Sequence, residues 1–465
     1  MTNYQLFYQS TNKDLQNGNQ GRFSFQEALL TGLAPDDGLF VFNQIPQLDF
    51  SALEQLRGRA YHELAYYILE LFLRQEIPAD QLKNIVQTTY APNPKWERGV
   101  SIPLELVKEN TFIARLDQGP TASFKDFAAQ FMARLFDYYR KPNQQITILV
   151  ATSGDTGSAV GEAFKGLEGI KVYILYPKNE VSPIQKHQLE TIGDNVITLS
   201  IDAKFDDCQA FVKQAFLDPE LSGLNLSSAN SINIGRLIPQ AIYYVYIYLQ
   251  ISRAWEPLVF SIPSGNLGNS LACEIARRMG LPVKKILIAT NANNAFPKFL
   301  QTGAYHKISP SLECVSNAMN VGNPSNLARY FHLFGGIVDK SGNVFQAPDL
   351  HAMREVLSGY DFSDEQTLAA MQKVYREYQI LLEPHGAIGW LALEQFELEN
   401  PELKHLKKVI IETAHPAKFP ETIEDSLSIS PENTPFLQAI QEKTGYSIAM
   451  PNDYTYFKNF LLQNT

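Results

Sequence analysis

The stretch ITILVATSGDTG, residues 146–157, joins a run of apolar and β-branched residues directly to a glycine-rich turn. The following residues predict a helix after Ser158, with Ala159, Val160 and Ala163 on its inner side. A continuous apolar run is typical of a strand that is buried on both faces of a parallel sheet. The order of strand, turn and helix therefore predicts an α/β fold with helices covering the sheet.

The same alternation continues in both directions from this stretch. Further strand-like runs occupy residues 171–175, 257–262, 284–289 and 408–412. One helix is expected to begin after Ser182, and another is expected to follow the 257–262 run and end at Met279. The run at 257–262 leads into a second glycine-rich turn, PSGNLGN, residues 263–269. We expect both turns at equivalent places in one mostly parallel sheet, where ligands lie beyond the carboxyl ends of the strands.

Each turn has the chemistry of an anion site. Glycines let the backbone approach a ligand closely, and the free amides and dipole of the following helix favour negative charge. One such turn alone is often a plain turn. Two of them make a stronger indication of phosphate or carboxylate binding. Neither fits the P-loop or the dinucleotide-binding pattern, which argues against a nucleotide cofactor.

A third feature is the segment GPTASFKD, residues 119–126, which precedes an amphipathic helix. Lys125 is expected in the first helical turn, beside the buried stripe that begins with Phe124 and Phe127. Most lysines on helices are simply solvated. The positive end of the helix dipole would lower the pKa of this one, and a neutral amine suits Schiff-base chemistry and proton abstraction. We expect Asp126 to cap the helix.

Composition sets limits on the class of protein. A chain of 465 residues, 45% of them hydrophobic, can bury an extensive core and form two or three domains. A formal net charge of −10 argues against nucleic acid as a main partner. The eight histidines show no metal-ligand spacing such as HExxH, so no metal site is expected.

The sequence also indicates a compartment. The first 25 residues lack the apolar core of a signal peptide, and the most apolar stretch, 241–251, is too short to span a bilayer. Cys208, Cys273 and Cys314 are widely spaced and odd in number, which fits a reducing compartment. We therefore expect a cytoplasmic protein without a membrane role.

The segment GPTASFKDF, residues 119–127, resembles the cofactor-lysine motif of the threonine synthases, which are fold-type II pyridoxal-phosphate enzymes related to tryptophan synthase β. Similar family segments lie at 32–39, 151–157, 230–236, 263–269, 316–319, 383–385 and 413–419, so the likeness spans almost the whole chain. The first and last of these are absent from cysteine synthases and serine dehydratases of the same fold. Asp37 and Asn320 depart from the commoner family pattern, which has glycine and aspartate there.

The resemblance implies a domain organisation. Residues 1–95 would form a small N-terminal α/β domain, and residues 96–465 the pyridoxal-phosphate-binding catalytic region of mostly parallel sheets covered by helices. Within that region, a smaller mobile lobe at about 110–240 would hold the 152–157 turn, and the remainder would form a larger lobe. Since the sequence has no obvious long extension for a regulatory ligand, we expect an unregulated monomer or homodimer.

The resemblance also implies roles for particular residues. Lys125 would carry pyridoxal 5'-phosphate, Thr413 would contact its pyridine nitrogen, and residues of the second turn would hold its phosphate, namely Gly265, Asn266, Leu267, Gly268 and Asn269. Two groups would bind substrate. The substrate carboxylate would lie on Thr152, Ser153, Asp155 and Thr156, and the leaving phosphate on Thr156, Asn230, Ser231 and Arg236. We expect structural roles for His385 and His415, and helix packing for Tyr243, Tyr244, Tyr246 and Tyr248.

The implied reaction is the PLP-dependent conversion of O-phospho-L-homoserine and water into L-threonine and phosphate, by γ-elimination and β-addition of water. This would make the chain a carbon–oxygen lyase at the last step of threonine biosynthesis. Two alternatives stay open at this point. The chain could eliminate phosphate without adding water, or act as a broader β-replacement or dehydratase enzyme of the same fold. A regulatory protein that binds the cofactor without catalysis is the third reading.

Overall fold

The computed structural model describes residues 5–96 and 98–464, and its strands form two separate parallel layers. One sheet has five strands in the order β15 (Ile448–Met450), β7 (Val196–Ile201), β6 (Ile170–Pro177), β5 (Ile146–Ala151) and β8 (Leu226–Ser228). The other has six, in the order β13 (Leu357–Asp361), β10 (Val283–Thr290), β9 (Leu258–Pro263), β14 (Lys407–Glu412), β4 (Thr111–Arg115) and β3 (Leu104–Lys108). Within these two sheets, every pairing is parallel except that of β3 with β4.

The expectation that both glycine-rich turns belong to one sheet is therefore wrong. The turn at 152–157 follows β5 in the five-stranded sheet, and the turn at 263–269 follows β9 in the six-stranded sheet. Both strands have the same run of buried residues from end to end. Nothing in their local pattern could say that they lie in different sheets, because strand pairing is a tertiary property.

Helices cover both sheets, as the alternation predicts. The long ones are α3 (Tyr61–Leu73), α4 (Ala79–Tyr90), α5 (Lys125–Tyr139), α6 (Asp155–Phe164), α8 (Phe205–Leu217), α9 (Ile238–Ile251), α10 (Gly268–Arg278), α14 (Asp364–Tyr378), α15 (Pro384–Glu399) and α18 (Tyr454–Asn464). The shorter ones are α1 (Phe25–Thr31), α2 (Phe50–Leu56), α7 (Pro183–Glu190), α11 (Ala295–Thr302), α12 (Leu327–Leu333), α13 (Leu350–Val356), α16 (Pro420–Leu427) and α17 (Pro435–Ile440). Short 3₁₀ segments are η1 (Pro219–Leu224), η2 (Ile234–Arg236), η3 (Asn317–Met319), η4 (Pro401–Leu403) and η5 (Pro416–Lys418). No helix among the described residues is long and apolar enough to cross a membrane.

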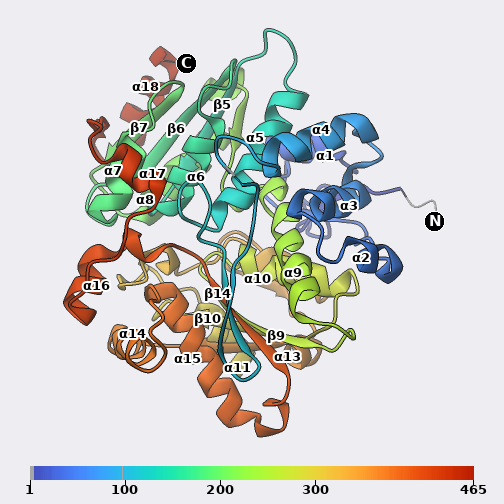
Figure 1. Ribbon diagram of the computed structural model, residues 1–465. Helices are drawn as coiled ribbons and strands as arrows, with labels where there is room; N and C mark the ends of the chain where they lie inside the picture. The colour runs from blue at the N-terminus through green and yellow to red at the C-terminus, as the bar shows by residue number, and fades with distance from the viewer. Residues whose placement is uncertain (1–4, 97, 465) are drawn as a thin grey trace.

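The two sheets form the cores of an upper and a lower lobe, with α9 and α10 between them (Figure 1). Alternate residues of β5 point into different hydrophobic clusters. Ile148 and Val150 pack on the side of α6, and Leu149 packs on the side of α8. Burial of both faces explains why the strand is apolar apart from Thr147.

A small N-terminal unit packs against the side of this two-lobed body. It contains the antiparallel pair β1 (Tyr8–Ser10) and β2 (Phe40–Phe42) and the helices α1 to α4, seen in blue at the right of Figure 1. Tyr61 of α3 joins it to the body through ring contacts with Phe127 of α5, at 5.7 Å, and Tyr246 of α9, at 5.1 Å. A second small antiparallel pair consists of β11 (Ile337–Val338) and β12 (Val344–Gln346).

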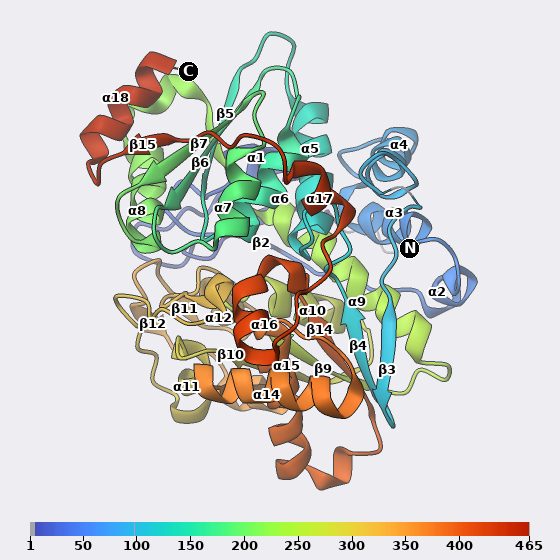
Figure 2. The ribbon, with the colours of Figure 1, turned by 60° about the vertical axis from the view of Figure 1, so that its left-hand side comes forward.

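The lobes are not continuous in sequence. The smaller lobe expected at about 110–240 contains β5 to β8, but β4 belongs to the six-stranded sheet of the other lobe. The chain also returns near its end, where α16 and α17 lead from the lower lobe back to β15 and α18 on the upper one (Figure 2). The position of β15 and α18 on the upper lobe depends on long-range packing, which the local sequence of this C-terminal segment does not predict.

Candidate active site

A cleft of about 830 Å³, counted with its mouth, opens where the ends of β5, β9 and β14 meet helix α5. Its lining includes all of the site residues expected from the sequence: Lys125, Thr152, Ser153, Asp155, Thr156, Asn230, Ser231, Arg236, Gly265, Asn266, Leu267, Gly268, Asn269 and Thr413. Residues spread over almost 300 positions are therefore brought to one place. This is the position expected for ligands of parallel sheets, beyond the carboxyl ends of the strands.

Lys125 is the first residue of α5, as expected, and its side chain is 13% exposed. The segment before it is fixed to the end of β14, because the Phe124 amide donates to the Thr413 carbonyl at 2.9 Å. Burial lowers the pKa of Lys125, the nearby Asp155 carboxylate opposes this, and the charges of Lys418 and Arg236 lower it further. The net shift of the Lys125 pKa is downward, toward the range in which an amine serves in nucleophilic and proton-transfer chemistry.

Asp126 does not cap α5, contrary to expectation. Its carboxylate accepts hydrogen bonds from the Thr121 amide at 2.8 Å and from the Thr121 hydroxyl at 2.7 Å, and so closes the 119–126 segment on itself. Burial raises the pKa of Asp126 to about 6. The residue shapes the loop that presents Lys125.

The turn at 152–157 is braced from within. The Thr152 hydroxyl accepts hydrogen bonds from the amides of Gly154 and Gly157, both at 2.9 Å, and the Thr152 amide donates to Leu175. Gly154 has φ +132°, which favours glycine, and α6 begins directly after it at Asp155 rather than after Ser158. Thr152 therefore lines the cleft mainly as part of its frame.

The Asp155 side chain is oriented toward positive groups. Its carboxylate lies 2.6 Å from the Lys418 Nζ and 3.5 Å from the Lys125 Nζ, and it accepts a hydrogen bond from Gln185 at 3.0 Å. Burial alone would raise the pKa of Asp155, but Lys418 and Lys125 outweigh it and the net shift is downward. A charged carboxylate repels a second one, so only the backbone amide of Asp155 is suited to a substrate carboxylate.

The turn at 263–269 presents backbone rather than side chains. Among the described residues, no acceptor is hydrogen-bonded to the amides of Gly265, Asn266 or Leu267. A Cβ at Gly265 would lie 3.0 Å from the Ala318 carbonyl oxygen and the Met319 Cα, so a larger residue would require this backbone to move by a few tenths of an ångström. Free amides ahead of the N-terminus of the 11-residue helix α10 form an anion cradle.

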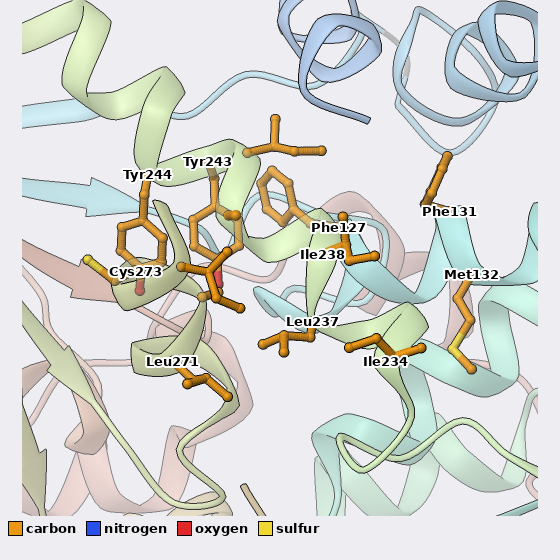
Figure 3. Close-up of a cluster of buried hydrophobic side chains, with 14 of the residues drawn as sticks. Phe127, Phe131, Met132, Ile234, Leu237, Ile238, Tyr243, Tyr244, Leu271 and Cys273 are labelled. Carbon is orange, nitrogen blue, oxygen red and sulfur yellow. The ribbon is translucent and has the colours of Figure 1, made fainter. Parts of the chain in front are cut away.

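Asn269 completes the cradle with help from α9. Its Oδ1 accepts hydrogen bonds from the hydroxyls of Tyr243 and Tyr244, the latter at 2.6 Å. Its Nδ2 is buried and has no partner among the described residues, which leaves a donor for a ligand. The expectation that the tyrosines of α9 only pack was thus incomplete. Figure 3 shows Tyr243 and Tyr244 extending from α9 toward α10, which carries Cys273.

Arg236 marks a second anion position. The side chain is 3% exposed, its Nη1 donates to the Ala229 carbonyl at 2.7 Å, and its Nε is buried without a partner among the described residues. Burial lowers the pKa of Arg236 to about 10, so the guanidinium stays charged at neutral pH. A buried cation with an unsatisfied donor in a cleft is well suited to bind an anion.

The neighbours of Arg236 are already partly engaged. The Asn230 side chain pairs with the backbone of Ala151, donating to its carbonyl at 2.7 Å and accepting from its amide at 3.2 Å. The Ser231 and Ser325 hydroxyls lie 3.3 Å apart. Asn230 therefore holds the end of β5 as well as lining the cleft.

Sequence reasoning gave no site role to three residues that line the cleft or support its lining: Lys418, His385 and Ser325. Lys418 is fully buried against Asp155, and it lies within the 413–419 segment, in which only Thr413 was given a site role and His415 a structural one. His385 lines the cleft, where its Nε2 accepts from the Ala318 amide at 3.2 Å and its Nδ1 contacts Glu383. The hydrogen bond from the Ala318 amide sets the tautomer of His385 and holds the 316–319 segment, so His385 has a positioning role at the site. Ser325, which donates to Asn266 at 3.0 Å, carried no sequence signal at all.

The residues present fit the expected cofactor. A phosphate would find the unpaired amides of the second turn and the orphaned Asn269 Nδ2, and an aldehyde would find the Lys125 amine in the same cleft. No group of three or more histidine, cysteine, aspartate or glutamate residues that could hold a metal ion occurs within the described part of the chain.

Comparison with known proteins agrees with this geometry. Residues 100–411 match the family model of pyridoxal-phosphate dependent enzymes, residues 7–90 match the threonine synthase N terminus, and residues 386–461 match the threonine synthase C-terminal region. The Haemophilus influenzae threonine synthase is 39% identical over 443 residues, which cover 95% of this chain and 97% of that protein. The Escherichia coli enzyme is 37% identical over 403 residues, covering 86% and 87%.

Solved structures show the same relationship. The Escherichia coli threonine synthase structure aligns with a TM-score of 0.87 at 32% identity, covering 99% of this chain and all of that one. The PLP-bound threonine synthase from Brucella melitensis aligns with a TM-score of 0.86 at 32% identity, covering 99% of both chains. The family resemblance and the fold class inferred from the sequence are thereby confirmed. The chain belongs to the threonine synthase family of pyridoxal-phosphate-dependent enzymes, and pyridoxal 5'-phosphate is its cofactor.

Proposed function

We propose that this protein converts O-phospho-L-homoserine and water into L-threonine and phosphate, the last step of threonine biosynthesis. The observation that carries the substrate assignment is the buried Arg236 guanidinium, whose Nε has no partner among the described residues. It provides a second anion position in the cleft, besides the cradle at the second turn. A substrate that carries its own phosphate accounts for this second anion position at Arg236.

The substrate carboxylate would lie at the N-terminus of α6. The amides of Ser153, Asp155 and Thr156 are without hydrogen-bond partners among the described residues, and they open a ten-residue helix whose dipole favours negative charge. The substrate phosphate would lie on Arg236, with Ser231, Asn230 and the Thr156 hydroxyl around it. Arginine suits this task because its planar fork matches phosphate geometry.

Once bound, the cofactor supplies an electron sink for charge that develops at the substrate Cα and Cβ. Lys125 takes and returns the protons at these two carbons, since its amine lies in the cleft with a lowered pKa. Arg236 stabilises the charge that develops on the phosphate as it leaves Cγ. Water then adds at Cβ, and a final protonation gives the product.

The decisive experiment measures both products together. The purified protein is incubated with pyridoxal 5'-phosphate and O-phospho-L-homoserine, and phosphate and threonine are assayed in the same samples. We expect equal amounts of the two. Release of phosphate with a 2-oxo acid and ammonia, but no threonine, would replace the proposal with a phospho-lyase.

Two variants control this experiment. Lys125→Ala removes the amine and should abolish the release of both products, by at least about a thousandfold in kcat. Lys83→Ala changes an exposed lysine of α4 that does not line the cleft, and it should leave the rate unchanged. Full activity of Lys125→Ala would contradict the assignment of the cofactor lysine.

Further proposals concern the molecule as a whole. We infer that the smaller lobe moves to cover the bound substrate and limits the access of water until it is needed. We also propose a cytoplasmic location, which the three free cysteines favour, and assembly as a monomer or homodimer. Light scattering of the purified protein tests the assembly, and a mass beyond twice 52.3 kDa would contradict it.

A further inference from the structure

A second lysine is buried beside the cofactor lysine. Lys418, at the end of η5, is fully buried, and its Nζ contacts the Asp155 carboxylate at 2.6 Å and donates to the Thr121 carbonyl at 3.2 Å. A buried ammonium group is costly unless it is paired and hydrogen-bonded. Both partners belong to segments that build the site, since Thr121 lies in the loop before Lys125 and Asp155 opens α6.

The two lysines share one carboxylate. Lys418 contacts Oδ1 of Asp155, and the Lys125 Nζ lies 3.5 Å from Oδ2. Gln185 also donates to Oδ1, which leaves Oδ2 directed to Lys125. Because Lys418 follows β14 of the larger sheet and Asp155 follows β5 of the smaller one, this ion pair also bridges the two lobes.

Few other charges surround Lys125. Arg236 at η2 adds a further positive charge, and His385 on α15 lines the same cleft. Asp126, the next residue on α5, directs its carboxylate to Thr121 instead. Asp155 is thus the negative charge paired with Lys125, and Lys418 competes for it.

We propose that Lys418 is a positioning residue that keeps Asp155 ionised and divides its two oxygens between the lysines, and thereby sets how readily Lys125 holds and releases a proton. The inference rests on the proposed role of Lys125. Without Lys418, the whole carboxylate would be available to Lys125, and one nearby positive charge would be gone. Both changes favour the protonated amine.

The test is a pH titration of the visible absorption band of the cofactor in the full-length holoenzyme. Lys418→Met removes the charge with little change in length and should move the midpoint upward by roughly one pH unit. It should lower kcat for O-phospho-L-homoserine with a smaller change in KM, because Lys418 does not line the cleft. Asp155→Asn should move the midpoint in the opposite direction.

Matched variants separate this role from a merely structural one. Lys418→Arg keeps the charge and should restore the wild-type midpoint, which loss of packing would not explain. Lys408 is a buried lysine of β14 that pairs with Glu397 at 2.9 Å away from the cleft, so Lys408→Met carries a similar loss of stability without a shift of the midpoint. If Lys418→Met does not fold, Lys418→Gln takes its place with the same expected upward shift, because it also removes the charge but keeps a hydrogen-bond donor for the Thr121 carbonyl.

The outcomes distinguish two kinds of failure. A cofactor band that is absent from the wild-type protein, or unaffected by Lys125→Ala, would overturn the assignment of Lys125 itself. A normal band whose midpoint is the same in Lys418→Met, Lys408→Met and wild type would overturn only the role of Lys418. A downward shift in Lys418→Met would also overturn it, since the expected electrostatic effect has the opposite sign.

Discussion

The two glycine-rich turns look alike in sequence but are held in different ways. The turn after β5 is stabilised by its own side chains, because the Thr152 hydroxyl binds two amides of the turn and Asp155 is fixed by two lysines. Both turns leave backbone amides free for a ligand, but the turn after β9 depends on neighbours for its support, namely the tyrosines of α9 and the 316–319 segment that approaches Gly265.

This difference corresponds to what each turn would bind. A cofactor phosphate stays in place through every turnover, so a cradle of free amides, fixed from outside, suits it. A substrate enters and leaves each time, and the turn proposed to receive it lies in the other lobe, in contact with Lys125 and Lys418. The same strand, turn and helix pattern thus serves two purposes, set by the surrounding charges.

The largest expected effect is on the substrate side of this comparison. Arg236→Gln removes the buried charge next to the substrate turn, and kcat/KM for O-phospho-L-homoserine should fall by about 100-fold or more, since hydrogen bonds to charged groups contribute roughly 2–3 kcal/mol. Steady-state kinetics measures this, with cofactor affinity followed by absorbance. A comparable loss of cofactor affinity would mean that Arg236 serves the cofactor and not the substrate.

The next largest effect is expected for the hydrogen bonds that the Thr152 hydroxyl accepts within the first turn. Thr152→Val leaves two buried amides without their acceptor and should reduce the free energy of unfolding by about 1–3 kcal/mol, whereas Thr152→Ser keeps the oxygen and should lose less. Denaturant unfolding compares the two variants. A larger loss in Thr152→Ser than in Thr152→Val would show that the methyl group, and not the hydroxyl, stabilises the turn.

A smaller effect is expected at the second turn. Gly265→Ala places a Cβ 3.0 Å from backbone atoms of Ala318 and Met319, so the cradle must shift and cofactor affinity should fall about tenfold, a cost near 1.4 kcal/mol. Titration of the cofactor-free protein measures the affinity. With saturating cofactor, KM for the substrate should stay close to wild type, and a rise in KM alone would contradict the separation of the two turns.

The smallest effect concerns the support from α9. Tyr244→Phe removes one of two hydroxyls that bind the Asn269 Oδ1, while Tyr243 keeps the other in place. Cofactor affinity should weaken by about threefold, since a neutral hydrogen bond contributes roughly 0.5–1.5 kcal/mol. Tyr246→Phe on the same helix is the control, and an equal effect there would point to packing of α9 as the cause.

Much of the site could be read from local patterns. Each expected residue follows a strand or begins a helix, and the rule that ligands lie at carboxyl strand ends places them together whether there is one sheet or two. Asp37 illustrates a finer signal: it stands where the family commonly has glycine, and its φ is +62°, in the region that favours glycine. There it forms an ion pair with Lys340 at 2.7 Å.

What the sequence could not supply were the partners of buried groups. Lys418 and Asp155 are 263 positions apart, and no local pattern marks which lysine a buried carboxylate will meet. The same holds for Asn269 with Tyr244 and for Asn266 with Ser325. Each pairing depends on helices and loops from different sheets being brought together by burial of their apolar sides.

The sequence by itself determined the elements, their α/β alternation, the two anion turns and the position of Lys125 at the start of a helix, because these depend on neighbours in the chain. Only the tertiary structure decided that the strands form two sheets, that the tail returns to the smaller lobe, and that one carboxylate serves two lysines. These features depend on long-range pairing and on the cost of burying charge, which are settled when the lobes close around a common cleft.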